Sequence, residues 1–410
     1  MPPSSVKTLD GVFAPEREGE VVDDRAHLPA LDGLRGVAVL LVVMLHLTMQ
    51  IHNPSGVTLV LKRVFSFGWS GVDLFFVLSG FLITGILDDA KGTTNYFRVF
   101  YARRMLRILP LYYGALLFVF VTPYLVSTPR IARFLVPLKD QLWYWFYLQN
   151  VHPLPQPFVG LVGHFWSLAI EEQFYLVWPV IILLLSRKSA LWVCAAILPL
   201  SIAYRAITSY VMPELGSYIA TFAHLDGLAV GSALALLYRT PGATDWIKRR
   251  LLPITAVSFA GMLILYNGWI STIKPAKHVL LGAFVALTYG CLLMYAVEQR
   301  RGPLASCLRS RIMRFFGRYS YGMYVLHIPL VSIGVTLTGF TPGRLRFFGW
   351  ELTGALLFIA FFLGVVTIAA WISYNVYEER FLRMKRRFVY RRPLAAVPHS
   401  ERESAIPISV

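Results

Sequence analysis

The chain has 410 residues, of which 56% are hydrophobic and 14% aromatic, whereas only 15% are charged. Soluble globular proteins carry roughly a quarter charged residues, so this composition excludes an ordinary soluble domain. The net charge of +17 does not indicate nucleic-acid binding, because the basic residues gather in short loops between apolar runs, where they orient helices and contact anionic lipids. The composition predicts an integral membrane protein with membrane lipids as partners and no nucleic acid.

Residues 1–29 are polar and acidic, with no basic region ahead of a short apolar stretch. A cleaved signal peptide needs both features, so we expect the first membrane helix to be an uncleaved anchor. We predict a disordered cytoplasmic arm over 1–29, a transmembrane domain over 30–380, and a basic, largely disordered cytoplasmic tail over 381–410.

Ten apolar runs follow one another along the chain, each near the length that crosses roughly 30 Å of hydrocarbon. They predict an all-α, polytopic fold of about ten transmembrane helices. The runs lie at about 36–51, 68–87, 108–126, 164–186, 190–208, 218–238, 251–270, 279–297, 319–340 and 349–375.

An eleventh candidate span at about 135–150 is more polar than the others. Its polar residues are Lys139, Asp140, Gln141, Gln149 and Asn150. If this segment does not cross, most loop Lys and Arg residues lie on the side of the amino terminus, and the positive-inside rule makes that side cytoplasmic. We therefore predict that 135–150 lies in or re-enters the outer interface, and that both termini are cytoplasmic.

The first membrane run begins with Asp32 and Arg35 and carries His46 eleven residues after Arg35. At 100° per residue, Arg35 and His46 share one helix face about 16.5 Å apart along the axis, and Asp32 can pair with Arg35. An Arg that only reaches the lipid head groups, and a His with a structural hydrogen bond, are the alternatives. A polar group at mid-membrane is costly and usually functional, which favours function for His46.

The second run contains Gly71, Asp73, Ser79 and Gly80. The glycines allow either close helix approach or a local backbone break. Packing alone would explain the glycines but not the carboxylate of Asp73.

Arg103, Arg104 and Arg107 enter the third run from the predicted cytoplasmic side. These residues could serve only to orient the helix in the membrane, but Lys would do that equally well. The planar guanidinium fork suits phosphate, which favours anion capture.

The fourth run carries two adjacent carboxylates, Glu171 and Glu172, about two turns inside the membrane. They cannot share a helix face, so we expect at least one to line a polar cavity or to pair with a buried base. Weaker polar patches lie at 224–227 and 320–327, and they include Asp226 and His327. The three cysteines form no metal or disulfide pattern, so we expect no metal.

Taken together, these segments resemble the acyltransferase-3 family over roughly residues 28–340. Members of that family are membrane enzymes that O-acylate lipopolysaccharide, other surface polysaccharides, peptidoglycan-type glycans and some antibiotics. The motifs that carry the resemblance are Leu31–Arg35 with His46, Gly71–Phe76 with Ser79–Leu82, Arg103–Pro110, and Trp166–Leu168 with Glu171, Phe174 and Tyr175.

The resemblance implies a bacterial cytoplasmic-membrane enzyme with acetyl-CoA or another acyl-CoA as cytoplasmic donor. The acceptor would be a sugar, glycolipid or glycoside that enters from the outer side past 135–163. Some relatives carry an extracytoplasmic hydrolase-like domain after the last helix. This sequence ends before one, so we expect acyl handling to be completed within the membrane domain.

An imidazole with a reference pKa near 6.5 can take a hydroxyl proton at neutral pH, and we expect Glu171 to orient it. We assign catalysis to His46, Glu171, Arg35 and Asp73. We assign the donor phosphates to Arg35, Arg103, Arg104 and Arg107. We assign the acceptor to Ser79, Trp166, Tyr175, Asp226 and His327.

A proton-coupled transporter or flippase of a glycan or lipid is the alternative function. In that reading Glu171, Asp73 and His46 form a proton relay together with Asp226.

Overall fold

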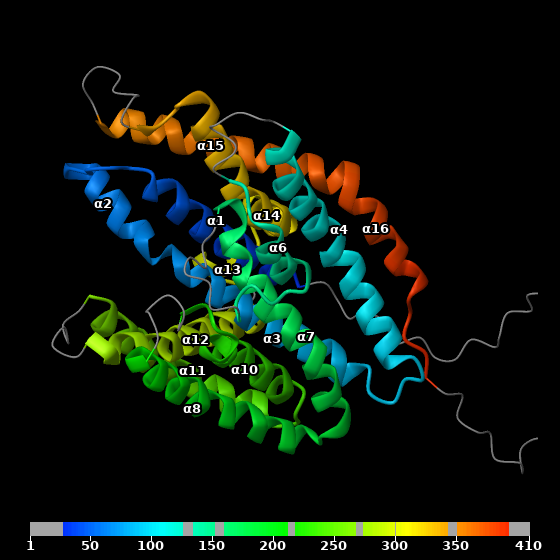
Figure 1. The fold of residues 1–410 in the computed structure, drawn as a ribbon. Coiled ribbons are helices and arrows are strands. Elements are labelled where there is room, and N and C mark those ends of the chain that lie inside the picture. The colour runs from blue at the N-terminus through cyan, green and yellow to red at the C-terminus, as the bar shows by residue number, and fades with distance from the viewer. Residues whose placement is uncertain are drawn as a thin grey trace, which may run out of the picture.

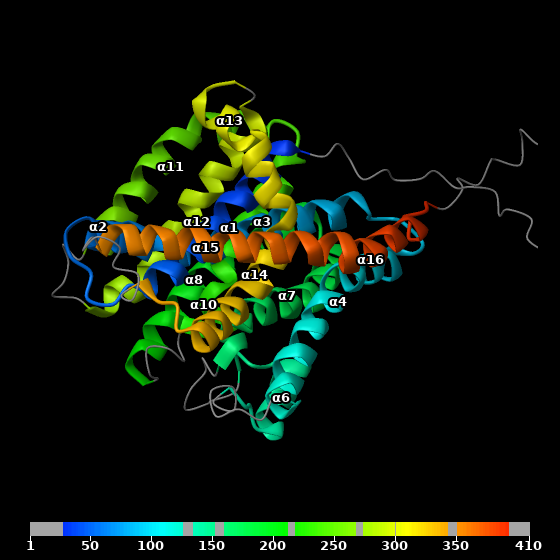
Figure 2. The same cartoon turned by 90° about the horizontal axis from the view of Figure 1, so that it is seen from above.

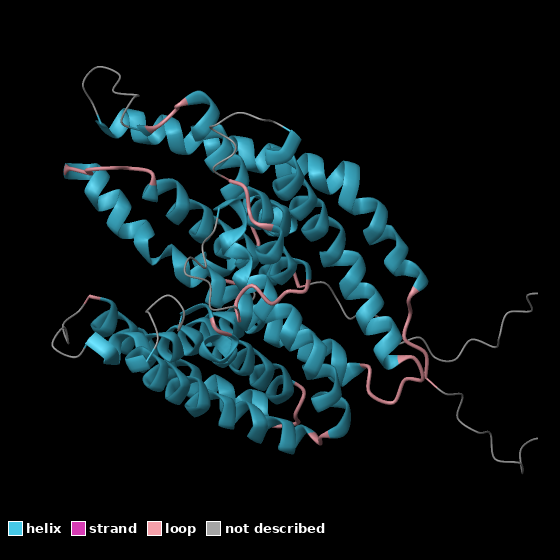
Figure 3. Cartoon of the chain, viewed as in Figure 1, coloured by secondary structure: helices cyan, strands magenta, loops and turns pink. Residues whose placement is uncertain are grey.

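The computed structural model describes residues 28–125, 134–151, 160–211, 218–267, 274–299, 301–342 and 351–392. Over these ranges the chain is helical and contains no β-strand (Figure 3). The arm predicted over 1–29 lies outside the described residues except for its last two, and Pro29 is the first residue of a helix.

Ten helical segments are long and apolar enough to span a membrane, which confirms the predicted polytopic all-α fold. The first five are α1 (Pro29–Met49), α2 (Gly56–Phe65) continued by η1 (Ser66–Trp69) and α3 (Ser70–Asp89), α4 (Tyr96–Leu125), α7 (Trp166–Leu184) preceded by η2 (Gly160–Phe165), and α8 (Arg187–Val211). The other five are α10 (Thr221–Tyr238), α11 (Ala243–Tyr266), α12 (Lys274–Glu298), α14 (Arg311–Thr338), and α15 (Glu351–Ile372) continued by η5 (Ser373–Glu378), α16 (Glu379–Met384) and η6 (Lys385–Arg387). A short helix, α13 (Pro303–Leu308), precedes α14.

The helices form two groups with α1 and α3 between them (Figure 1). On one side, α3 packs against α10, and α8, α11 and α12 complete that group. On the other side, α1 packs against α14, beside α4 and α15. The polar residues of α1 and α3 therefore face the interior of the bundle.

Segment 135–150 contains one short helix, α6 (Leu138–Trp145). Eight residues of α-helix extend only about 12 Å, so α6 cannot cross the membrane, as predicted. It lies beside the end of α4 (Figure 2). Tyr112 and Tyr113 of α4 hold it there by donating to the carbonyl oxygens of Tyr144 at 2.7 Å and Trp145 at 3.1 Å.

Small residues bring the central helices into backbone contact. A Cβ on Gly80 would lie 2.1 Å from the carbonyl oxygen of Leu228 in α10, and one on Gly71 would lie 2.5 Å from that of Ala38 in α1. Helix α3 runs through both glycines without a break. They therefore serve close approach, the first of the two roles that the sequence allowed.

Gly80→Ala is expected to destabilise the fold, because α3 and α10 must separate to admit the methyl group. Overpacking of this kind costs typically about 1–3 kcal/mol. The measurement is the thermal transition of purified protein in detergent. Gly364→Ala in α15 is the matched control, since a Cβ there meets no atom within 4 Å. Equal transitions for the two variants would contradict the packing.

The start of the segment predicted as a tail is ordered. Helix continues to Arg387, and Asn95 in the loop before α4 contacts the residues that follow. Its Nδ2 donates to the carbonyl oxygen of Val389 at 2.8 Å, and its Oδ1 accepts from the amide of Arg391 at 3.1 Å. The part of the predicted tail from 393 to 410 lies outside the described residues.

The predicted orientation places the loop before α4 in the cytoplasm and α6 outside. Cysteines introduced at Thr93 and at the exposed Lys139 are expected to react with an impermeant thiol reagent from opposite sides of the membrane. Of the native cysteines only Cys307 is exposed, so Cys307→Ser is the background. Labelling of both positions from one side would contradict the ten-span topology. Gln156, which would also report the outer side, lies outside the described residues.

Candidate active site

Two adjoining cavities lie inside the bundle. The inner one lies between α1, α3, α4, α7 and α14, and the other between α1, α4, α14 and the end of the last helix from η5 to η6. The inner cavity has a volume of about 90 Å³ and the chamber next to it about 500 Å³. Arg35, Arg107 and Tyr321 line both. The two spaces therefore meet at these three side chains, at the end of the bundle where α1 and α4 begin.

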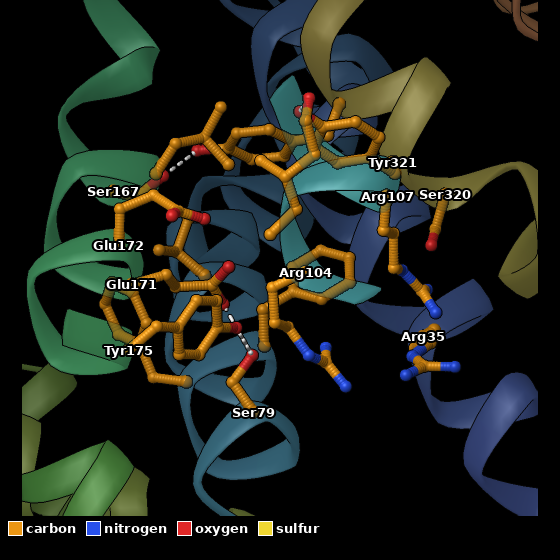
Figure 4. Close-up of a pocket in the computed structure, with 16 residues that line it drawn as sticks. Arg35, Ser79, Arg104, Arg107, Ser167, Glu171, Glu172, Tyr175, Ser320 and Tyr321 are labelled. Atoms are coloured by element: carbon orange, nitrogen blue, oxygen red, sulfur yellow. Dashed lines mark hydrogen bonds between the residues drawn. The ribbon is translucent and has the colours of Figure 1, made fainter. Parts of the chain in front are cut away.

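One side of the inner cavity is cationic. Figure 4 shows the guanidinium groups of Arg35, Arg104 and Arg107 together on this side. Arg35 pairs with Asp32 at 3.2 Å, as the sequence predicts. Arg104 lies over the ring of Tyr175, 5.9 Å from its centroid. These cations gather from two different helices, an arrangement suited to an anion.

The opposite side of the inner cavity is acidic (Figure 4). Glu171 accepts a hydrogen bond from the Ser79 hydroxyl at 2.6 Å, and that hydroxyl accepts one from Tyr175 at 3.1 Å. Glu172 lines the same cavity, and its Oε1 is buried without a hydrogen-bond partner. Both neighbouring carboxylates therefore border the cavity, although they leave α7 in different directions.

Tyr324 and Ser167 close the inner cavity at its far end. Their hydroxyls form a short hydrogen bond of 2.5 Å, and Tyr324 also contacts the carbonyl oxygen of His164 at 3.0 Å. Three imidazoles lie next to Tyr324, whose ring centroid is 5.4 Å from that of His164 and 5.7 Å from that of His327. The ring centroid of His327 is 4.9 Å from that of His46 and 4.7 Å from that of His164.

His46 lies with these imidazoles and lines neither cavity. Its Nδ1 donates to the carbonyl oxygen of Val42 at 2.8 Å, so the proton is on Nδ1 and the lone pair of Nε2 is left as a base. The carboxylate of Glu171 is bonded to Ser79 instead of the His46 ring. In this structure the main chain of α1 orients the His46 ring, and the expected role of Glu171 in orienting it stays a prediction.

Asp73 and Asp226 lie in a second polar cluster between α3, α8 and α10. Asp73 contacts Nδ1 of His224 at 3.2 Å, and Asp226 pairs with Arg205 at 2.7 Å. Neither carboxylate lines the two cavities. Trp166 packs on His224, with ring centroids 5.0 Å apart. The structure thus brings together Arg35, Arg104, Arg107, Ser79, Glu171 and Tyr175, but it separates Asp73, Asp226 and Trp166 from them.

Arg103 also departs from its predicted place among the donor ligands. Its Nε donates to the carbonyl oxygen of Phe388 at 2.8 Å, and its guanidinium lies over the ring of Tyr390. Adjacent residues diverge by 100° around a helix, so Arg103 cannot point where Arg104 points. It binds the segment after η6 and lines neither cavity.

Several cavity residues were not assigned from the sequence. They are Arg314, Arg318, Tyr321, Glu378 and Lys385 in the chamber, and Ser167 and Tyr324 in the inner cavity. The patch at 320–327 was a usable signal for the two tyrosines. The sequence does not single out Arg314, Arg318 and Lys385, because the positive-inside rule alone explains the basic residues around them.

The fold and cavities define a polytopic membrane protein with a buried polar site that is cationic at one end and acidic at the other. The chain belongs to the acyltransferase-3 family, whose acyltransferase domain matches residues 28–374.

Named relatives support this membership. The chain is 30% identical over 342 residues to the peptidoglycan O-acetyltransferase OatA of Listeria monocytogenes, an alignment that covers 75% of this chain and 50% of the relative. It is 30% identical over 338 residues to the putative peptidoglycan O-acetyltransferase YrhL of Bacillus subtilis, and this alignment covers 75% of this chain and 49% of the relative. It is 29% identical over 329 residues to the O-acetyltransferase OatA of Staphylococcus aureus, an alignment that covers 74% of this chain and 51% of the relative. The chain spans about half the length of these curated relatives, and no solved structure matches it.

Proposed function

We propose that the protein is an O-acyltransferase of the bacterial cytoplasmic membrane. It moves an acyl group, acetyl by default, from cytoplasmic acyl-CoA to a hydroxyl of a cell-surface polysaccharide, glycolipid or glycoside. The relatives named as peptidoglycan O-acetyltransferases make a peptidoglycan-type glycan the first acceptor to test. Both termini of the membrane domain are cytoplasmic in this proposal.

The observation that supports the proposal is the junction of the two cavities at Arg35 and Arg107. The larger, basic chamber would hold the phosphate end of the donor. The uncharged pantetheine arm would pass this junction into the inner cavity, so the thioester would come to rest among Ser79, Glu171 and Tyr324.

The acceptor would approach from the outer side, where His46 lies. Nε2 of His46 takes the hydroxyl proton, and the hydroxyl oxygen bonds to the thioester carbonyl carbon. The carbon–sulfur bond then breaks, the ester leaves with the acceptor, and the coenzyme thiolate takes up the proton. In this geometry the Tyr324–Ser167 pair stands between the thioester and His46, so its hydrogen bond must open for transfer.

A donor-only assay tests this function. Purified protein of the Cys307→Ser background in lipid nanodiscs is given acetyl-CoA without acceptor, and free coenzyme thiol is followed. Slow thioester hydrolysis that depends on the protein supports an acyltransferase. Complete inertness toward acetyl-CoA, together with proton-coupled uptake of a glycan or lipid into vesicles, would favour the transporter instead.

A further inference from the structure

The larger chamber carries an excess of positive charge. Five cations line it, whereas among the described residues only two carboxylates do, those of Asp32 and Glu378. Asp32 is already paired with Arg35, and Glu378 accepts from the Ser373 hydroxyl at 2.9 Å. The cations are Arg35, Arg107, Arg314, Arg318 and Lys385. A volume of about 500 Å³ falls within the usual range of small-molecule sites, roughly 300–1,000 Å³. The chamber is therefore suited to a polyvalent anion of small-molecule size.

Part of this chamber comes from residues that lie after the end of the family match. The family match ends at residue 374, yet Glu378, Leu382 and Lys385 line the chamber. Glu378 is the last residue of a stretch of π-helix, η5 (Ser373–Glu378), and Leu382 and Lys385 follow it. Such stretches are rare and occur frequently at functional sites. The end of the last helix thus contributes its own side chains to the site.

Four residues after η6, which we call the strap (388–391), fasten this helix end to α4 and the loop before it. Arg103 binds the carbonyl oxygen of Phe388 at 2.8 Å, and Asn95 binds Val389 and Arg391. Tyr390 is buried under the guanidinium of Arg103. The strap therefore fixes the position of η6, and it gives Arg103 a structural role that its placement in the sequence does not indicate.

Lys385 differs from the basic residues around it. Arg383, Arg386 and Arg387 are exposed, whereas Lys385 is half-buried and lines the chamber. Across the described residues it forms no ion pair with a carboxylate. Withdrawing an ammonium from water without a partner is costly, and a bound anion would offset that cost.

We infer that Lys385, held in place by the strap, binds the phosphate groups at the nucleotide end of the thioester donor. The inference rests on the proposed acyl-CoA donor, and it adds a binding residue that lies beyond the family match. Lys385 acts on donor binding, together with Arg314 and Arg318, and takes no part in the transfer step.

Binding to the full-length protein in nanodiscs tests the inference. Isothermal titration compares coenzyme A with S-acetylpantetheine, which lacks the phosphates. For Lys385→Gln the Kd of coenzyme A is expected to rise about ten- to hundredfold, as for loss of one charged hydrogen bond, while the Kd of S-acetylpantetheine stays unchanged. Lys385→Arg keeps the charge and is expected to restore most of the affinity. Arg386→Gln, an exposed neighbour of equal charge, is the matched control.

Two further variants keep the test decisive. Lys385→Met retains the aliphatic stem and replaces Lys385→Gln if that variant does not fold. Asn95→Ala loosens the strap and is expected to weaken coenzyme A binding in the same direction as Lys385→Gln. Unchanged coenzyme A affinity in Lys385→Gln or Lys385→Met, with binding by the parent protein intact, overturns the inference and leaves the proposed function standing. Failure of the parent protein to bind coenzyme A overturns both.

Discussion

His46→Ala is expected to reduce acyl transfer about 10²–10⁴-fold, the usual contribution of a general base, while the protein still inserts at normal abundance. Nδ1 of His46 donates its proton in a hydrogen bond to the carbonyl oxygen of Val42, and this leaves Nε2 as the basic atom. The ring packs against that of His327, 4.9 Å away between centroids. The measurement is ester formation on an acceptor glycan, at saturating donor, by purified protein of matched concentration.

The matched control for this substitution is His52→Ala. His52 is exposed in the loop after α1, on the same side of the bundle, so its loss removes an imidazole without touching the buried cluster. Transfer at the parental rate by His46→Ala would remove His46 from the mechanism. Glu171→Gln would then be the next variant to measure, because Glu171 lines the inner cavity.

The second large effect is expected for Arg104→Lys combined with Arg107→Lys. Both side chains line the inner cavity. Lysine keeps the charge, so membrane orientation should survive, but it lacks the planar two-pronged donor geometry. A charged hydrogen bond contributes roughly 1.5–3 kcal/mol. Loss of one contact should therefore raise the KM for acyl-CoA about ten- to hundredfold, with the KM for the acceptor near its parental value.

Arg98→Lys is the control for the double variant. Arg98 lies on the same helix, α4, but is exposed. If these arginines only set topology, the donor KM should be unchanged both in Arg98→Lys and in the double variant. A donor KM that is unchanged in the double variant would mean that Arg104 and Arg107 only set the orientation of the helix in the membrane. Arg103 is left out of this variant, because it binds the carbonyl oxygen of Phe388 and lines neither cavity.

The ten spans could be predicted because hydrocarbon thickness sets helix length directly. Charge placement likewise predicted that the segment containing Lys139 and Asp140 does not cross, and α6 confirms this. The pairing of Asp32 with Arg35 followed from local helix spacing.

The rest of the site depends on tertiary packing, which spacing does not determine. Arg103 and Arg104 are neighbours in sequence, and only the rotation of α4 against its partners decides which of them faces the cavity. The partner of Glu171 is Ser79 on α3, 92 residues away. Lys385 belonged to a run that reads as a disordered basic tail, and only the strap shows why it points inward.

The proposed function is the transfer of an acyl group to a glycan hydroxyl by this membrane domain. The most direct measurement uses purified protein in proteoliposomes, [¹⁴C]acetyl-CoA as donor and a soluble peptidoglycan fragment as acceptor, with mass spectrometry of the product. We expect an acceptor that is heavier by one acetyl ester, and the amount of this product should fall about 10²–10⁴-fold with His46→Ala. A glycan that is transported across the bilayer but recovered without an ester, while acetyl-CoA remains intact, would contradict it.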